Sequence, residues 1–149
     1  MAALEASSLR QLAAYRETVQ GVTSASEILD VLRTRLAEDL ASGHVKVLAE
    51  LIAAGTSDSA LREKVRELFE PWMALSAETV TGILAASGLD AVLPGEQVAF
   101  AVVCLILGVQ QFVTLTGDSQ RALDMVDAGR NVASMFDAMF ATGGEDGSK

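Results

Sequence analysis

Apolar residues recur at helical spacing along nearly the whole chain, and no stretch alternates apolar and polar residues long enough to predict a strand. Glycine, proline and capping residues divide this pattern into segments. Ser24 and Glu27 form a capping box, and Gly117 interrupts the pattern just before Asp118, a second capping residue. The sequence therefore predicts an all-α antiparallel bundle of about six helices, over residues 2–20, 24–43, 44–54, 58–87, 94–116 and 118–140.

The fourth predicted helix contains Pro71. Proline has no backbone N–H, so it removes the hydrogen bond to the carbonyl of Glu67, and its ring crowds the preceding turn. We expect a kink at this position. Pro94, in contrast, is placed to open the fifth helix, where a first turn needs no such hydrogen bond.

The last two predicted helices carry more apolar surface than one chain of this length can cover. The fifth is apolar around nearly its whole circumference, with a seam of small residues on one side and larger residues, including Leu105, on the other. The larger residues are predicted to face the core of the monomer. The small seam and a matching stripe on the sixth helix predict a four-helix interface in a two-fold homodimer. Its expected residues are Ala101, Cys104, Gly108, Gln111, Ala122, Gly129, Ala133 and Phe136.

Composition favours one domain, predicted over residues 1–141, followed by a disordered polar tail over 142–149. Half of the 149 residues are apolar and 21% are charged, a balance that supports a packed core. The net charge is −9, and no Lys or Arg occurs between Glu67 and Gln120. This acidity argues against binding nucleic acid or an anionic membrane surface. The apolar run over 98–109 has 12 residues, whereas a membrane span needs about 20.

The chain offers little catalytic chemistry. Cys104 is the only cysteine and His44 the only histidine, and neither is spaced with other ligands as in a metal site. No nucleophile elbow, phosphate-binding glycine loop or paired-carboxylate motif occurs. We therefore expect no cofactor, no metal and no enzymatic activity. A lone thiol and the lack of an export signal favour the cytoplasm.

Two runs resemble the regulatory domain of TetR-type transcriptional regulators, namely HVKVLAELIAAGTSDSALREKVRELFEPW and VAFAVVCLILGVQQFVTLTGDSQRALDMV. The resemblance is one of lengths and residue types, and it covers about three quarters of the chain. It implies that an apolar ligand enters between the long kinked helix and its neighbours. No segment matches the helix-turn-helix of that family, so the resemblance implies no DNA binding by this chain. The ligand-binding residues it implies are Phe69, Trp72, Met73, Ser76, Phe100 and Gln110.

Two functions follow from these patterns. The first is a dimeric, ligand-binding domain resembling that of a TetR-type regulator, without a DNA-binding module. The alternative is a helical protein–protein interaction module, such as a partner or antagonist of a full-length regulator, with a fully packed interior and no small-molecule ligand. A cavity beside Trp72 would favour the first function, because a fully packed interior leaves no room for a ligand.

Overall fold

A computed structural model describes residues 2–42 and 44–141 of the chain. All regular secondary structure in this part of the chain is helical, which confirms the all-α prediction. The predicted polar tail at 142–149 lies outside the described residues. The helices are α1 (Ala2–Val19), α2 (Ala25–Ser42), α3 (His44–Gly55), α4 (Ser59–Ala86), α5 (Gly95–Thr116) and α6 (Ser119–Ala141).

Local side-chain chemistry explains where the helices begin and end. Asp58 caps α4 by accepting hydrogen bonds from the backbone N–H groups of Ala60 at 2.9 Å and Leu61 at 3.1 Å. The hydroxyl of Ser24 accepts from the N–H of Glu27 at 3.2 Å at the start of α2, as a capping box requires. α5 ends at Gly117, whose φ of 73° is in the left-handed region that favours glycine.

The proline positions differ slightly from their predicted roles. Pro94 precedes α5 in an extended conformation, so it occupies the capping position and the helix begins one residue later. α4 continues through Pro71 as one helix of 28 residues. The predicted kink there stays a prediction.

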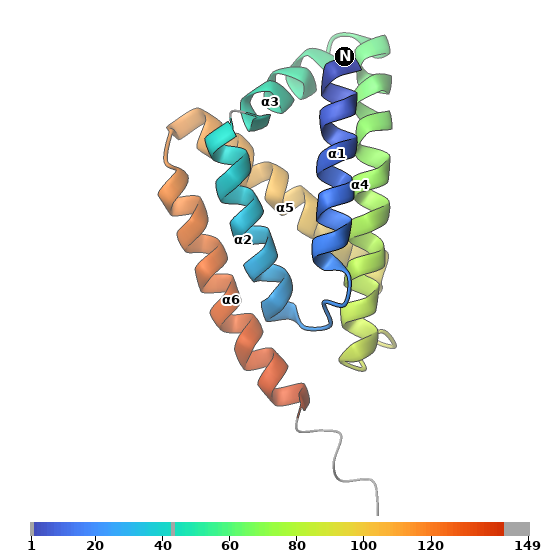
Figure 1. Ribbon diagram of the computed structural model, residues 1–149, viewed down its shortest axis with the longest axis vertical. Coiled ribbons are helices and arrows are strands. Elements are labelled where there is room, and N and C mark those ends of the chain that lie inside the picture. Colours follow the sequence, from blue (N-terminus) through green and yellow to red (C-terminus); the bar gives the residue numbers. More distant parts are fainter. Residues whose placement is uncertain (1, 43, 142–149) are drawn as a thin grey trace, which may run out of the picture.

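The helices form two groups, which Figure 1 shows side by side. In one group, α4 packs against α5, with α1 and α3 beside them; in the other, α6 runs along α2. α5 passes behind the space between the groups, and it meets α6 only slightly, near the turn that joins them. The last two helices therefore have different main partners within the chain.

The core is small for a chain of this size. One cluster joins the two groups, formed by Leu36 of α2, Val113 of α5 and Ala122 of α6. Leu75, Ile83 and Leu84 of α4 are buried elsewhere. Among the described residues, no large side chain is completely buried. Much of the apolar surface of α5 and α6 is therefore left exposed to solvent.

Candidate functional site

The six predicted ligand-binding residues divide between two sides of α4. Trp72 lies on the side that faces α1, whereas Met73 lines a cleft towards α5 together with Phe100. Phe69, Ser76 and Gln110 line neither this cleft nor the hollow beside Trp72. Of the six residues, Met73 and Phe100 are the two that line the same hollow.

Trp72 is held by contacts within the chain. Its indole Nε1 donates a hydrogen bond to the hydroxyl of Ser8 on α1 at 3.0 Å. Its ring meets Tyr15 edge to face, with centroids 5.7 Å apart and planes 60° apart. These contacts satisfy both the polar and the aromatic part of the side chain. They assign Trp72 a packing role between α1 and α4.

A shallow pocket of about 230 Å³ lies beside Trp72, between α1 and α4. Its apolar lining includes Leu12, Leu68 and Pro71. Lys64 and Glu67 also line it, and they form an ion pair in which Nζ lies 2.9 Å from Oε2. Small-molecule pockets usually measure about 300–1,000 Å³. This pocket is therefore too small to enclose a ligand of that kind.

The second hollow is an open cleft of about 400 Å³ between α4 and α5, which we call the α4–α5 cleft. Its lining combines an apolar wall with a carboxylate and an amide. The sequence analysis did not predict three of the lining residues as ligand-binding residues, namely Ala77, Glu96 and Gln97. Glu96 is nevertheless the only charged residue between Asp90 and Asp118. The cleft is lined by Met73, Ala77, Glu96, Gln97 and Phe100.

The buried polar side chains of the described residues already have hydrogen-bond partners, so none of them requires a ligand. In the described part of the chain, no buried side-chain nitrogen or oxygen lacks a hydrogen-bond partner. Ser76 and Gln110 are half-buried, and an unmet hydrogen bond at either would indicate a ligand, because a buried polar side chain needs a partner. They give no such indication.

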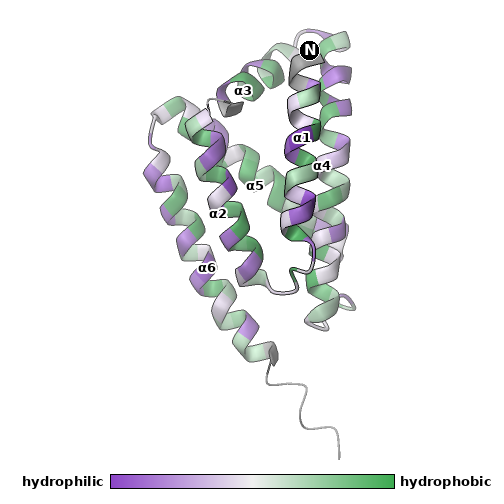
Figure 2. Cartoon of the chain, in the orientation of Figure 1, coloured by the Kyte–Doolittle hydropathy of each residue, from purple (hydrophilic) through white to green (hydrophobic). Residues whose placement is uncertain are grey.

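The predicted seam on α5 faces solvent. Ala101, Cys104 and Gly108 are exposed and Gln111 is half-buried. Leu105 was expected in the core but is exposed as well, because the opposite side of α5 packs on α4 and α3. Figure 2 colours much of α5 as hydrophobic. We define the α5 face as the exposed, uncharged surface formed by Ala101, Cys104, Leu105, Gly108, Phe112 and Leu115.

The predicted dimer residues of α6 have a partner within the chain. Ala122 and Ala133 are buried, and Gly129 lies next to a methyl group of Leu29 on α2. Phe136, the fourth predicted residue, is half-buried. This stripe packs against α2, so its burial requires no second chain. The exposed apolar residues of α6 lie on its neighbouring flank, at Met125, Val132, Met135 and Met139.

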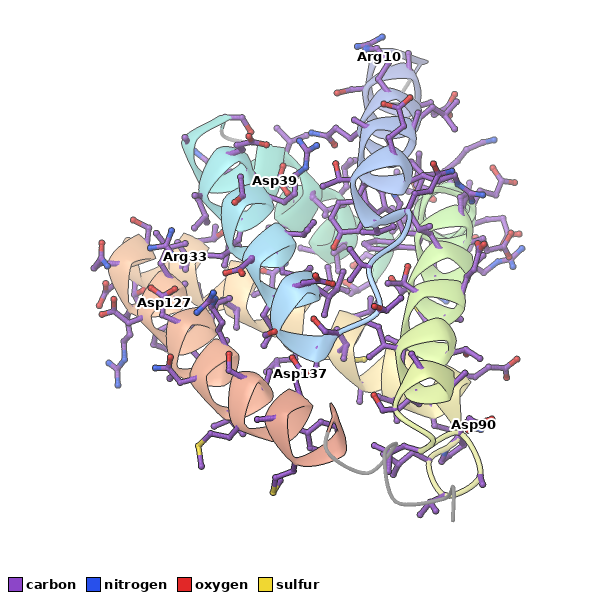
Figure 3. The ribbon with its side chains drawn as sticks, turned by 60° about the horizontal axis from the view of Figure 1, so that its bottom comes forward. Arg10, Arg33, Asp39, Asp90, Asp127 and Asp137 are labelled. Carbon is purple, nitrogen blue, oxygen red and sulfur yellow. The ribbon has the colours of Figure 1, made fainter. Side chains whose placement is uncertain are left out.

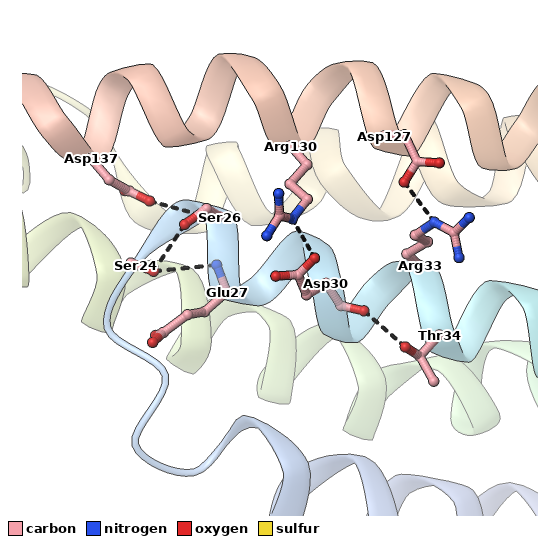
Figure 4. A network of polar contacts seen from close by, with 9 residues as sticks. All are labelled: Ser24, Ser26, Glu27, Asp30, Arg33, Thr34, Asp127, Arg130 and Asp137. Atoms are coloured by element: carbon pink, nitrogen blue, oxygen red, sulfur yellow. Dashed lines mark hydrogen bonds and ion pairs between the residues drawn. The ribbon is translucent and has the colours of Figure 1, made fainter.

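Polar contacts hold α6 to α2 along one edge, as Figure 4 shows. Arg33 donates from Nε to Asp127 at 2.6 Å, and Arg130 pairs with Asp30. Figure 3 shows Arg33 and Asp127 close together, far from Asp90. These exposed pairs each contribute little to stability, but their regular spacing fixes the antiparallel register of the two helices.

Asp137 caps the start of α2 from the far end of the sequence. Its carboxylate accepts from the N–H groups of Ala25 at 3.1 Å and Ser26 at 3.0 Å. Burial alone would raise the pKa of Asp137, but the hydrogen bonds from Ser26 and Ala25 outweigh it and lower that pKa. The contact adds to the Ser24 cap a second capping residue more than 100 positions away.

Two further features bear on chemistry and environment. No group of three or more His, Cys, Asp or Glu side chains that could hold a metal ion occurs among the described residues. α5 has 22 residues, and it is the one described helix that is long and apolar enough to cross a membrane. It is thus longer than the 12-residue apolar run that it contains. Unlike the core helix of a soluble protein, α5 is mostly not buried within the described chain.

Comparison with known proteins found no relative of this chain. The resemblance to the regulatory domain of TetR-type proteins therefore stays a prediction. No protein-family model, no curated protein and no solved structure matches this chain.

Proposed function

We propose that this chain is a dimeric helical regulatory domain that acts by binding, without covalent chemistry, and that two copies associate through the α5 face. The observation that carries this proposal is the exposure of that face. Leu115 is 84% exposed and Leu105 is 59% exposed, on a helix without a single charge from Gln97 to Gly117. A contiguous exposed apolar surface of this kind usually marks an interaction site.

The total exposed area supports an interface of ordinary size. The chain exposes 9276 Å², whereas a compact monomer of 15.6 kDa exposes about 7,300 Å². The chain as a whole therefore exposes more area than a compact monomer, by an amount larger than the ~800 Å² that one partner buries in a standard interface.

The distribution of charge allows a second copy to be the partner. Two chains that each carry a net charge of −9 repel one another at long range. The α5 face contains none of that charge, so two copies can meet there without opposing like charges in contact. Gly108 lies near its middle, and a Cβ atom built there would meet nothing within 4 Å. A second helix can therefore approach the backbone closely at this point.

A membrane is a less suitable partner for α5. The opposite side of α5 packs on α4, and insertion would separate the two helices and expose the buried residues between them.

The regulatory part of the proposal rests on the α4–α5 cleft and on the resemblance to TetR-type regulatory domains. A ligand in the cleft contacts α5 directly through Phe100 and Gln97. It would therefore favour one placement of α5 on α4, and with it one geometry of the paired chains. In this proposal, a DNA-binding partner or module responds to the arrangement of the two paired chains.

A second candidate function is a module that binds a different protein. The exposed flank of α6 carries three methionines, and flexible thioether side chains adapt well to different partners. In this case the α6 flank is the docking surface, and the α4–α5 cleft has no ligand.

A pair of matched variants tests the proposal. Phe112→Glu places a charge on the α5 face, and Ala74→Glu places the same charge on an exposed position of α4. We expect sedimentation velocity to show a dimer for the native chain and for Ala74→Glu, and a monomer for Phe112→Glu, because a buried unpaired carboxylate opposes association. Circular dichroism checks that both variants remain helical. A dimer that survives Phe112→Glu would contradict the proposed interface and would favour the α6 flank.

A further inference from the structure

We propose that the α4–α5 cleft binds a monovalent organic cation that carries an aromatic or branched apolar group. This inference rests on the proposed regulatory function and names the class of its ligand. The cleft has a volume of about 400 Å³ and is wide open to solvent, so it suits a ligand that keeps part of its surface in water. Its lining combines the two kinds of group that recognise such a cation.

The first kind is the apolar wall. Met73 and Ala77 come from α4 and Phe100 from α5, so the wall joins both helices. Phe100 is 60% exposed, which leaves a large part of its surface available to a ligand. The face of an aromatic ring attracts a positive charge, and a thioether next to it adds polarizable apolar contact.

The second kind is the carboxylate of Glu96. It is the only charged group on α5, and no ion pair among the described residues includes it. Glu96 thus places a negative charge beside the apolar wall without a cation of the protein to neutralise it. Gln97 next to it can accept one further hydrogen bond.

This combination selects against other ligand classes. An anion would meet the Glu96 carboxylate and the net charge of −9. A neutral apolar ligand would gain the wall but nothing from the carboxylate. An inorganic cation would gain the carboxylate alone, since no group of three acidic or other metal-binding side chains occurs among the described residues. An organic cation uses both.

Isothermal titration with three probes tests this inference on the full chain. Benzyltrimethylammonium is the cation, and benzyl alcohol and phenylacetate are its neutral and anionic counterparts. We expect measurable binding of the cation only, weakened about two- to fivefold by Glu96→Gln and by Phe100→Leu. Asp90→Asn removes a carboxylate outside the cleft and should leave binding unchanged. Binding of the three probes with equal affinity, or full cation binding by Glu96→Gln, would overturn the inference, as would no binding of the cation.

The same samples separate this inference from the proposed function. Glu96→Gln leaves the residues of the α5 face intact, so sedimentation should still show a dimer. A dimer that binds no cation contradicts the ligand class alone. A native chain that sediments as a monomer contradicts the proposed dimeric function, whatever the cleft binds.

Discussion

Tyr15 and Trp72, the only tyrosine and the only tryptophan of the chain, meet edge to face between α1 and α4. Burial raises the pKa of Tyr15 to about 12, and Arg35 and Asp39 nearby have smaller, opposing effects. The raised pKa means that the folded state holds the phenolic proton more tightly than the unfolded state. A titration of the single tyrosine therefore reports directly on the packing of α1.

We expect this contact to make stability fall in alkaline solution. The contribution of Tyr15 is complete below its ordinary pKa of 10.0, and it is lost as the pH rises through about 12. Denaturant unfolding across this range should show a smaller decline in the free energy of unfolding for Tyr15→Phe than for the native chain. The ultraviolet absorbance of tyrosinate gives the pKa itself. Ionisation near pH 10 in the folded chain would show that α1 does not bury Tyr15.

Asp137 allows a second prediction about a single side chain. Asp137→Ala removes the acceptor for two backbone N–H groups at the start of α2, and loss of a helix cap typically lowers the free energy of unfolding by about 1 kcal/mol. Because its pKa is lowered, the contribution of Asp137 is present above the ordinary pKa of Asp and is lost as the pH falls through the lowered value. Urea denaturation at neutral pH measures the effect. Asp90→Ala, in the turn before α5, is the control, and an equal loss in both variants would refute the capping role.

The ends of the helices were predictable because they depend on neighbouring residues. Ser24, Asp58 and Asp118 cap the helices that follow them, and Gly117 ends α5 with the left-handed conformation that glycine adopts readily. Each of these interactions connects residues within about four positions of one another. Propensity and spacing therefore contain enough information to locate them.

The partner of each helix was less predictable. The buried and exposed stripes of α6 are offset by three residues, as Ala122 and Met125 or Gly129 and Val132 illustrate, which is only about 60° of helix rotation. Both stripes are apolar, so periodicity alone cannot tell which one α2 covers. The contacts that decide it, such as Arg33 with Asp127, join residues 94 positions apart.

The junction of α4 and α5 gives a prediction for these elements. A Cβ atom at Gly95 would collide with the hydroxyl of Thr81, so Gly95→Ala should lower the free energy of unfolding by roughly 1–3 kcal/mol. Gly82→Ala should raise it by up to about 1 kcal/mol, because that position has open space and alanine is the better helix former. Thermal unfolding compares the two. A neutral Gly95→Ala would mean that the helices are further apart than described.

The candidate site was predictable in part. Met73 and Phe100 line the α4–α5 cleft, as their places on the fourth and fifth helices implied. Trp72 belongs instead to the α1 contact, because Ser8 supplies the partner for its indole N–H across 64 positions of sequence. Glu96 was not predicted as a ligand-binding residue, because the helix dipole favours a carboxylate in the first turn of any helix. Its position therefore needed no ligand to explain it.

At the scale of the whole molecule, the small core and the exposed α5 face have one common explanation. The chain has enough apolar residues for a larger core, but α5 and α6 present many of them to solvent. In the proposed dimer, the second copy covers these residues, so that folding and association depend on one another.

Sedimentation equilibrium of the native chain at micromolar concentration tests this claim most directly. The dimer proposed here predicts a single species with twice the mass of the 15.6 kDa chain. A homogeneous species of 15.6 kDa would contradict it.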